Sequence, residues 1–177
     1  MPTYDQHTAG CRVFSFKEGL LSAVAHDLRL RVERFAVDLS DDMSRVSATF
    51  DPRSIRVEGA VIDGYLDEQV LSSRDKAKIE KNIVTDVIAV KKWPQIRFAS
   101  SSITATDGGW RVIGELELAG KRRSITVQAR RDGDHIVADV PLHQPNFGIK
   151  PFTAMLGTLK IKPGVRVSLR VPVPEGM

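Results

Sequence analysis

The sequence lacks the features on which disulfide-rich, membrane-spanning and nucleic-acid-binding proteins depend. It contains one cysteine, Cys11, among 177 residues, which excludes an intrachain disulfide framework. Its apolar runs are far shorter than the roughly 20 residues that span a bilayer as a helix. Its basic cluster, Lys121-Arg122-Arg123, is short and has no interleaved aromatic residues. We therefore expect no transmembrane segment and no nucleic-acid partner.

Sequence motifs that indicate catalysis or metal binding are also missing. The chain has no Gly-x-Ser-x-Gly elbow, phosphate-binding loop, Cys-x-x-Cys pair, His-Glu-x-x-His motif or acidic calcium loop. His26 and Asp27 are neighbours, but adjacent side chains on a strand point to opposite faces, which argues against a dyad. We expect His26 to be buried and to donate to a backbone or ligand oxygen. No catalytic residue, metal or cofactor is predicted.

Length and composition are those of one ordinary globular domain. The formal net charge is +4, and basic and acidic residues are interspersed, which indicates a solvated surface of mixed sign. No composition break divides the chain, so a single domain over residues 1–177 is predicted. The first residues show no basic segment followed by an apolar core. We therefore expect a cytoplasmic protein, or a periplasmic one if the chain is a trimmed form of an exported precursor.

Alternation of apolar and polar residues with a period of two dominates the sequence and predicts antiparallel strands. The apolar series Leu28, Leu30 and Val32 is followed by a step of three to Phe35, which is typical of a β-bulge in a long bent strand. In the second half, alternating runs cover residues 110–118, 125–129, 136–142 and 165–171. Short turns rich in Gly and Asp separate the first three of these runs, which predicts a meander.

One amphipathic helix interrupts the strands. Ser72 to Asp75 resembles a capped helix start with an acidic residue in the first turn. Trp93-Pro94 closes the segment. We expect the helix to lie across one end or side of the sheet and to bury a single apolar stripe, which consists of Ile79, Ile83, Val84, Val87 and Ile88.

Three motifs, in this order, carry a resemblance to a known family. They are Trp93-Pro94-Gln95-Ile96-Arg97-Phe98-Ala99-Ser100, Gly114-Glu115-Leu116-Glu117-Leu118-Ala119-Gly120 and Asn146-Phe147-Gly148-Ile149. Together with the N-terminal strand at residues 12–17 and the Ser54-Ile55 segment, they resemble the YceI-like, lipocalin-like, polyisoprenoid-binding family. The chain departs from the family pattern at residues 25–28 and in the charged helix at residues 74–81, so the head-group site is expected to differ.

The resemblance implies a mainly β fold, an eight-stranded antiparallel lipocalin-like barrel with one amphipathic helix. It also implies non-catalytic binding, sequestration or transport of an isoprenoid, quinone-like or fatty-acyl lipid in an apolar tunnel. Eight strands enclose room for one small ligand, and each CH₂ group removed from water contributes about 0.8 kcal/mol. The candidate ligand-binding residues are Phe14, Phe16, His26, Phe35, Phe98, Trp110, Phe147, Phe152 and Met155.

Two other functions remain open on the sequence alone. The first is an interaction or accessory protein whose barrel is filled by its own side chains and whose outer face binds a partner protein. The second is an enzyme that acts on a lipid, with His26 as a general base. A homodimer is possible through the helix or a sheet edge. The stretch at residues 147–156, apolar but broken by Gly and Pro, is expected to form an irregular strand or a flap at the barrel mouth.

Overall fold

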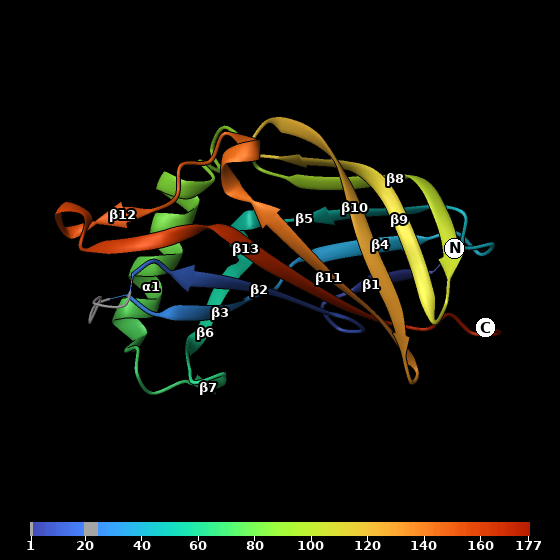
Figure 1. Ribbon diagram of the computed structural model, residues 1–177, viewed down its shortest axis with the longest axis horizontal. Helices are drawn as coiled ribbons and strands as arrows, with labels where there is room; N and C mark the ends of the chain where they lie inside the picture. Colours follow the sequence, from blue (N-terminus) through green and yellow to red (C-terminus); the bar gives the residue numbers. More distant parts are fainter. Residues whose placement is uncertain (1, 20–24) are drawn as a thin grey trace.

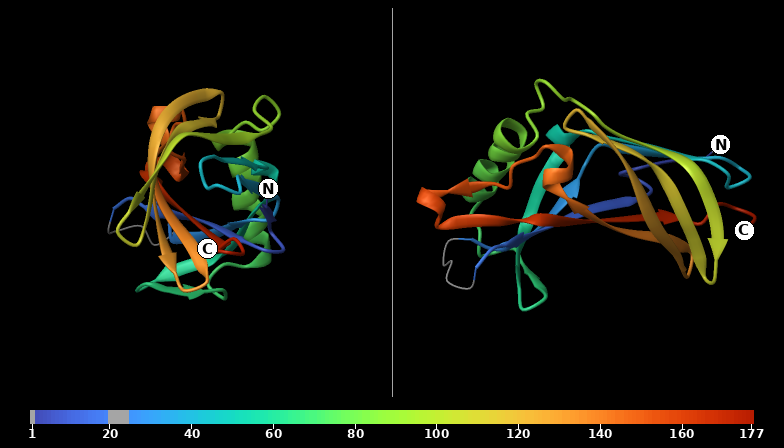
Figure 2. Two further views of the ribbon diagram at one scale, coloured as in Figure 1. Left: turned by 90° about the vertical axis from the view of Figure 1, so that its right-hand side faces the viewer. Right: turned by 45° about the horizontal axis from the view of Figure 1, so that its top comes forward.

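The structure is a computed structural model that describes residues 2–19 and 25–177. Its strands form a curled antiparallel sheet, a half-barrel (Figures 1 and 2). In chain order the strands are β1 (Thr3–Asp5), β2 (Gly10–Lys17), β3 (Asp27–Val32), β4 (Phe35–Leu39), β5 (Val46–Phe50), β6 (Ile55–Ile62), β7 (Tyr65–Asp67), β8 (Ile96–Thr106), β9 (Gly109–Leu118), β10 (Lys121–Asp132), β11 (His135–His143), β12 (Thr153–Ala154) and β13 (Leu159–Pro172). The helical elements are η1 (Pro52–Ser54), α1 (Ser73–Asn82), η2 (Ile83–Val87), η3 (Gln144–Phe147) and η4 (Met155–Gly157).

The second half of the chain forms the meander that the alternating runs predict. Strands β8, β9, β10 and β11 are neighbours in sequence order, and β11 then pairs with β13. The β9–β10 ladder begins at the pair Leu118 and Lys121 and continues to Gly109 and Arg130. Strand β13 pairs with β2 on its other side, so the last strand joins the N-terminal strands to the meander.

A bend joins β3 to β4 and, beside it, β5 to β6. The chain leaves one ladder at Val32 and enters the next at Phe35, where the step of three predicts an irregularity. The amide of Glu33 donates to the carbonyl of Ser54 at 3.1 Å, and hydrogen bonding thus continues across the bend. The buried Ser54 hydroxyl accepts from the Arg34 amide at 2.8 Å and donates to the Asp51 carbonyl at 2.7 Å. Ser54 therefore holds both bent strands together.

The prediction of a mainly β chain with one amphipathic helix is confirmed, but the strand number and closure are different from the prediction. The hydrogen-bonded order runs as a path, β1-β4-β5-β8-β9-β10-β11-β13-β2-β3-β6-β7, with β12 paired to β13. Its ends are the short strands β1 and β7. Eight long strands are obtained only when β3–β4 and β5–β6 are each counted as one bent strand and the short strands β1, β7 and β12 are left out.

Helix α1 begins at the predicted cap and lies across one end of the curled sheet (Figures 1 and 2). The Ser72 hydroxyl accepts from the Asp75 amide at 3.1 Å, and the Asp75 carboxylate accepts from the Ser72 amide at 3.3 Å. The apolar stripe packs against the core as predicted. The helical segment ends at Val87, earlier than the predicted Trp93-Pro94, and Ala89 then takes a left-handed conformation.

No helix in the described part of the chain is long and apolar enough to cross a membrane.

Two glycines of the sequence motifs are required by close packing. A Cβ atom at Gly114 on β9 would collide with the ring of Phe98 and the carbonyl of Ala99 on the neighbouring β8. Gly120, in the β9–β10 turn, has φ +76° and lies against the ring of Trp93. The glycines of the second motif thus leave room for the aromatic rings of the first.

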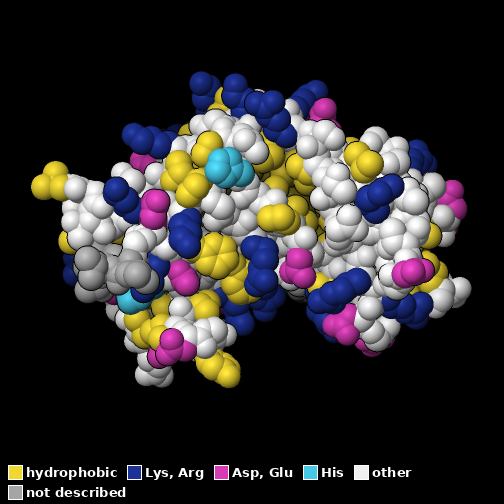
Figure 3. Space-filling view, in the orientation of Figure 1, with side chains coloured by type: hydrophobic (Ala, Val, Ile, Leu, Met, Phe, Trp, Pro, Cys, Tyr) yellow, Lys and Arg dark blue, Asp and Glu magenta, His cyan; other side chains and the backbone are white. Residues whose placement is uncertain are grey.

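The outer surface carries charges of both signs, as the composition predicts (Figure 3). Among the described residues, the most buried charged side chain is that of Glu58, located at the register shift between β3 and β6. Arg29 donates to its carboxylate at 2.5 Å, and Arg12 pairs with its other oxygen at 2.7 Å. This cluster ties β2, β3 and β6 together on the outer face.

Candidate ligand-binding cavity

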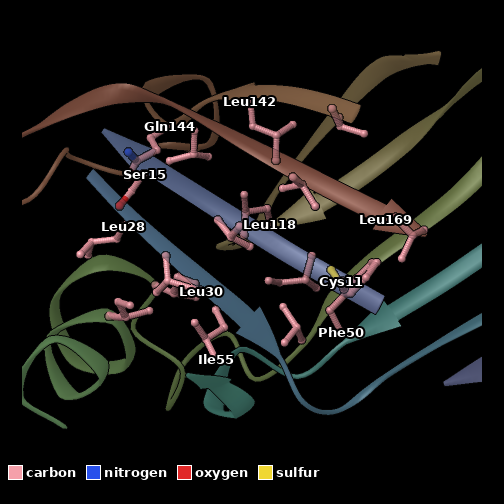
Figure 4. Close-up of a pocket in the computed structure, with 18 of the residues that line it drawn as sticks. Cys11, Ser15, Leu28, Leu30, Phe50, Ile55, Leu118, Leu142, Gln144 and Leu169 are labelled. Atoms are coloured by element: carbon pink, nitrogen blue, oxygen red, sulfur yellow. The ribbon is translucent and has the colours of Figure 1, made fainter. Parts of the chain in front are cut away.

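The curled sheet and α1 enclose a cavity of about 690 Å³. This volume falls within the range of roughly 300–1,000 Å³ that small-molecule sites occupy. Side chains from strands on all sides point into it, and most are aliphatic (Figure 4). Residues that show this arrangement include Cys11, Leu28, Leu30, Phe50, Ile55, Leu118, Leu142 and Leu169.

Strand alternation builds this lining, because every second residue of a strand faces the interior. On β13 the basic residues Arg166 and Arg170 face outward, and the apolar residues between them face the cavity. The same holds on β3, where Arg29 and Arg31 are outside. The inward series are Cys11, Val13 and Ser15 on β2, Leu28, Leu30 and Val32 on β3, and Val165, Val167, Leu169 and Val171 on β13.

The cavity has one end where its lining reaches solvent, and we call this end the mouth. The exposed lining residues Val70, Asp75, Lys78 and Met155 all lie here, on α1, just before it, or on the hairpin of β12 and β13. In Figures 1 and 2, α1 and β12 lie at the same end of the molecule. The lining residues with charged, amide, imidazole or serine hydroxyl groups are at this end too; they are Ser15, His26, Asp75, Lys78, Asn82 and Gln144.

At the opposite end, the deep end, the lining is mainly apolar and shielded from solvent, and it includes the buried Tyr4, which carries a hydroxyl. Cys11 and Val171 are buried there, and Trp110 is half-buried. Burial raises the pKa of the Cys11 thiol from 9.0 to about 12, although the nearby Arg12 acts in the opposite direction. Burial, together with the charge of Glu175, also raises the pKa of Tyr4 above its usual value. Both groups are thus held in their neutral forms.

Five of the predicted site residues line the cavity. His26 and Met155 are at the mouth, and Trp110 is at the deep end. Phe98 lies on β8, and its ring packs over Gly114. It belongs to the wall of the cavity, by which we mean the inward-facing residues of the long strands. Phe152 precedes β12 and lines the cavity beside the hairpin.

The other four predicted residues do not line the cavity. Phe14 and Phe16 are on the outer face of β2, and the Arg166 guanidinium lies 4.4 Å from the centre of the Phe14 ring. Phe35 is buried and stacks on Phe50 at 6.1 Å between ring centroids. Phe147 is buried behind the lining, in a cluster with Leu116, Leu118 and Ile149, which themselves line the cavity. A two-residue period separates the two faces of a strand but does not show which face is inward. Phe14 lies between Arg166 and Arg29 on the neighbouring strands, and its face is therefore the outer one.

Sequence reasoning missed the aliphatic residues that dominate the lining. Their signal was present in the alternating series on β3 and β13, because those series identify one apolar face on each strand. The predicted site consists mainly of aromatic residues, but the wall consists mainly of Leu, Val and Ile. Residues of α1 such as Asn82 were missed for another reason, since only the placement of the helix brings them to the mouth.

His26 and Asp27 do not form a dyad. His26 is half-buried and lines the mouth, whereas the Asp27 carboxylate accepts a hydrogen bond from the Lys17 amide at 2.8 Å. Asp27 thus fastens the start of β3 to the end of β2. Within residues 2–19 and 25–177, no three His, Cys, Asp or Glu side chains are grouped to hold a metal ion.

The fold and cavity define a β-sheet binding domain with an enclosed apolar interior. Residues 6–173 match the YceI-like domain, and the chain belongs to this family. No curated protein sequence matches the chain.

Solved structures share the fold at low sequence identity. BcnA from Burkholderia cenocepacia superposes with a TM-score of 0.68 at 15% identity, over 96% of this chain and 99% of that one. A polyisoprenoid binding domain from Saccharophagus degradans, implicated in plant cell wall breakdown, gives 0.57 at 12% identity, over 94% of each chain. The Campylobacter jejuni YceI protein gives 0.53 at 12% identity, over 82% of this chain and 85% of that one.

Proposed function

We propose that this protein binds one isoprenoid or similar long-chain amphiphilic lipid in its cavity, for sequestration or transport and without catalysis. The observation that carries the proposal is the distribution of polarity along the cavity. Charged and amide lining residues are confined to the mouth, and the deep end is mainly apolar and shielded, with the Tyr4 hydroxyl as an exception. Such a gradient matches a molecule with one polar end and one long apolar end.

The lining can supply the binding energy without reactive chemistry. Each CH₂ group that leaves water contributes about 0.8 kcal/mol, so a chain of moderate length binds firmly in an aliphatic cavity. The head group would remain near Asp75, Lys78 and Asn82, which lie three and four residues apart and therefore share one face of the helix. His26 and Gln144 border the same space from the sheet side.

We further propose that the wall functions as an eight-stranded barrel. The two bent strands, β3–β4 and β5–β6, lie side by side. One of them pairs with β2 through β3, and the other pairs with β8 through β5. The bent hairpin therefore connects β2 to β8, the two long strands that the hydrogen-bonded order leaves far apart. Ser54 and the hydrogen bonds at the bend support this role.

Membership in the YceI-like family supports the choice of ligand class, since the fold-related Saccharophagus degradans protein is described as a polyisoprenoid binding domain. Quinone-like and fatty-acyl lipids share the same chemistry, a polar end on an apolar chain. The competing hypothesis of a filled barrel is disfavoured by the volume of the cavity, about 690 Å³.

Native mass spectrometry and organic extraction of the purified protein test the proposal. We expect an extractable lipid with a prenyl or acyl chain, and binding of a fluorescent prenyl or acyl probe by the stripped protein. Co-purification of no lipid, combined with no probe binding, would overturn the proposal.

A matched pair of variants on β10 locates the binding. Val127 faces the cavity and its neighbour Thr126 faces solvent. Val127→Phe should weaken probe binding by about tenfold or more while changing stability little, because the added ring enters empty space rather than packed atoms. Thr126→Phe adds a ring to the outside of the same strand and should leave probe affinity unchanged. Equal effects of the two variants would place the probe elsewhere.

A further inference from the structure

The hairpin between β12 and β13 carries two of the most exposed large apolar side chains of the described chain. Leu156 is fully exposed and Met155 is 62% exposed. They belong to η4, at the tip that projects beyond α1 in Figure 1, and apolar side chains stand out at the same extremity in Figure 3. Apolar groups that project singly from a surface are common, but two adjacent ones at a projecting tip beside a cavity mouth suggest a binding partner.

The backbone of this tip is strained as well. Met155 and Leu156 have φ of 54° and 56°, in the left-handed region that side chains other than Gly rarely adopt. Only the third residue, Gly157 with φ 85°, suits that region. Strain of this kind persists where the surrounding structure imposes it, and it is concentrated at functional positions. Here it presents two apolar side chains to solvent.

The surrounding structure that holds the tip is a short ribbon. Thr153 pairs with Lys160 and Ala154 with Leu159. The amide of Ile161 donates to the carbonyl of Phe152 at 3.1 Å. The tip is thus held out from the body of the molecule by hydrogen-bonded strands.

The charges within the hairpin segment itself are all positive, and at the neighbouring end of β2 Lys17 lies opposite Ile161, followed by one acidic residue, Glu18, whose amide donates to the Lys160 carbonyl at 2.9 Å. The segment from Gly148 to Gly164 contains Lys150, Lys160 and Lys162 and no acidic residue. Lys160 and Lys162 are exposed on β13, where they alternate with residues that line the cavity. An apolar tip flanked by lysines is complementary to a bilayer surface with anionic head groups.

We propose that the β12–β13 hairpin docks the protein on an anionic lipid bilayer. Leu156 and Met155 insert among the head groups and upper acyl chains, and the three lysines contact the anionic head groups. Met155 also lines the cavity at its mouth, so docking brings the mouth to the membrane surface. The docking itself does not require a lipid in the cavity; its use in loading and unloading rests on the proposed function.

Vesicle flotation with the full chain tests the docking. We expect the protein to float with phosphatidylcholine vesicles that contain about 30% phosphatidylglycerol and to bind pure phosphatidylcholine far more weakly, with binding that falls as salt is added. Leu156→Asp should weaken binding by about tenfold or more, because it removes the inserted apolar side chain. Met177→Asp changes an exposed apolar residue at the C-terminus and should have no effect.

A charge-reversal pair tests the lysines. Lys160→Glu combined with Lys162→Glu should reduce binding to the anionic vesicles by about tenfold or more, since each basic residue near such a surface contributes about fivefold. The control is Arg130→Glu combined with Arg131→Glu, which changes the net charge equally. Those arginines lie beside the β10–β11 turn, next to the C-terminal end of β13 and far from the tip. The control should bind nearly as the wild type does.

The outcomes separate the two proposals. Leu156 does not line the cavity, so Leu156→Asp should keep wild-type affinity for the fluorescent prenyl or acyl probe without vesicles. Docking is overturned if the wild type fails to float with anionic vesicles, or if Leu156→Asp floats as the wild type does. Vesicle binding that persists in a protein unable to bind the probe would instead refute the proposed function and leave the docking intact.

Discussion

The wall and the mouth of the cavity differ in architecture, polarity and solvent exposure. The wall consists of long paired strands whose inward residues are aliphatic and largely shielded from solvent. The mouth is made of a helix, a short hairpin and strand ends, and it includes exposed Asp75 and Lys78, the exposed Val70 and the strained tip at Met155 and Leu156.

The difference shows how one domain separates stability from recognition. In the wall, packing and hydrogen bonds leave little freedom for substitution, and the apolar lining contributes affinity without selecting a head group. At the mouth, exposed groups stabilise the fold little and are available to contact a ligand or a surface. Substitutions at packed positions of the wall should therefore change folding, whereas substitutions at the mouth, or at wall positions such as Val127 that face the empty cavity, should change binding.

The largest expected contrast between the two regions is in thiol reactivity. Cys11 is buried in the wall with a pKa of about 12 instead of 9.0. At pH 8 its thiolate fraction is therefore on the order of a thousandfold below that of an ordinary thiol. Alkylation of Cys11 should be slower by a similar factor than that of Val70→Cys in a Cys11→Ser background, measured by mass spectrometry.

The pH dependence of this reaction has a definite sign. Because the folded chain holds the Cys11 thiol protonated, its alkylation rate should keep rising above about pH 10, where an exposed thiol with an ordinary pKa approaches its plateau. Comparable rates for Cys11 and for the cysteine at position 70 near neutral pH would show that the wall is open to solvent at Cys11.

The next contrast compares two glycines. Gly114→Ala should lower the free energy of unfolding by about 3 kcal/mol, because its Cβ meets the Phe98 ring and the Ala99 carbonyl. Gly157→Ala at the mouth meets only the flexible Lys160 side chain at 3.5 Å, but its φ of 85° is strained, so about 1 kcal/mol is expected. Urea denaturation measures both. A smaller loss at Gly114 than at Gly157 would reverse the comparison.

The smallest contrast concerns a hydroxyl at the bend of the wall. Ser54→Ala removes the buried hydroxyl that accepts from the Arg34 amide in a partly buried hydrogen bond, and should cost about 2 kcal/mol. The control Ser102→Ala, at an exposed position on β8, should stay within about 0.5 kcal/mol of the wild type. If both serines prove equally dispensable, the bend does not depend on this hydroxyl.

Much of the wall was predictable because it follows local rules. The alternation on residues 28–32 and 165–171, the slip before Phe35 and the cap at Ser72 each indicated an element that the structure contains. The choice among aromatic residues was less successful. Phe14 and Phe98 both lie in alternating runs, but only Phe98 faces the cavity, because neighbouring strands determine which face is enclosed.

Local patterns in the sequence are enough to predict most elements of this protein, since periodicity, capping and turn residues act over a few positions along the chain. Three properties depend on tertiary contacts: which faces enclose the cavity, the gathering of charged and amide lining residues at one end, and the position of a strained apolar tip beside lysines there. These properties join residues distant in sequence, such as His26, Asp75 and Met155. No local pattern encodes that proximity, because it depends on how the whole sheet curls and where the helix is placed.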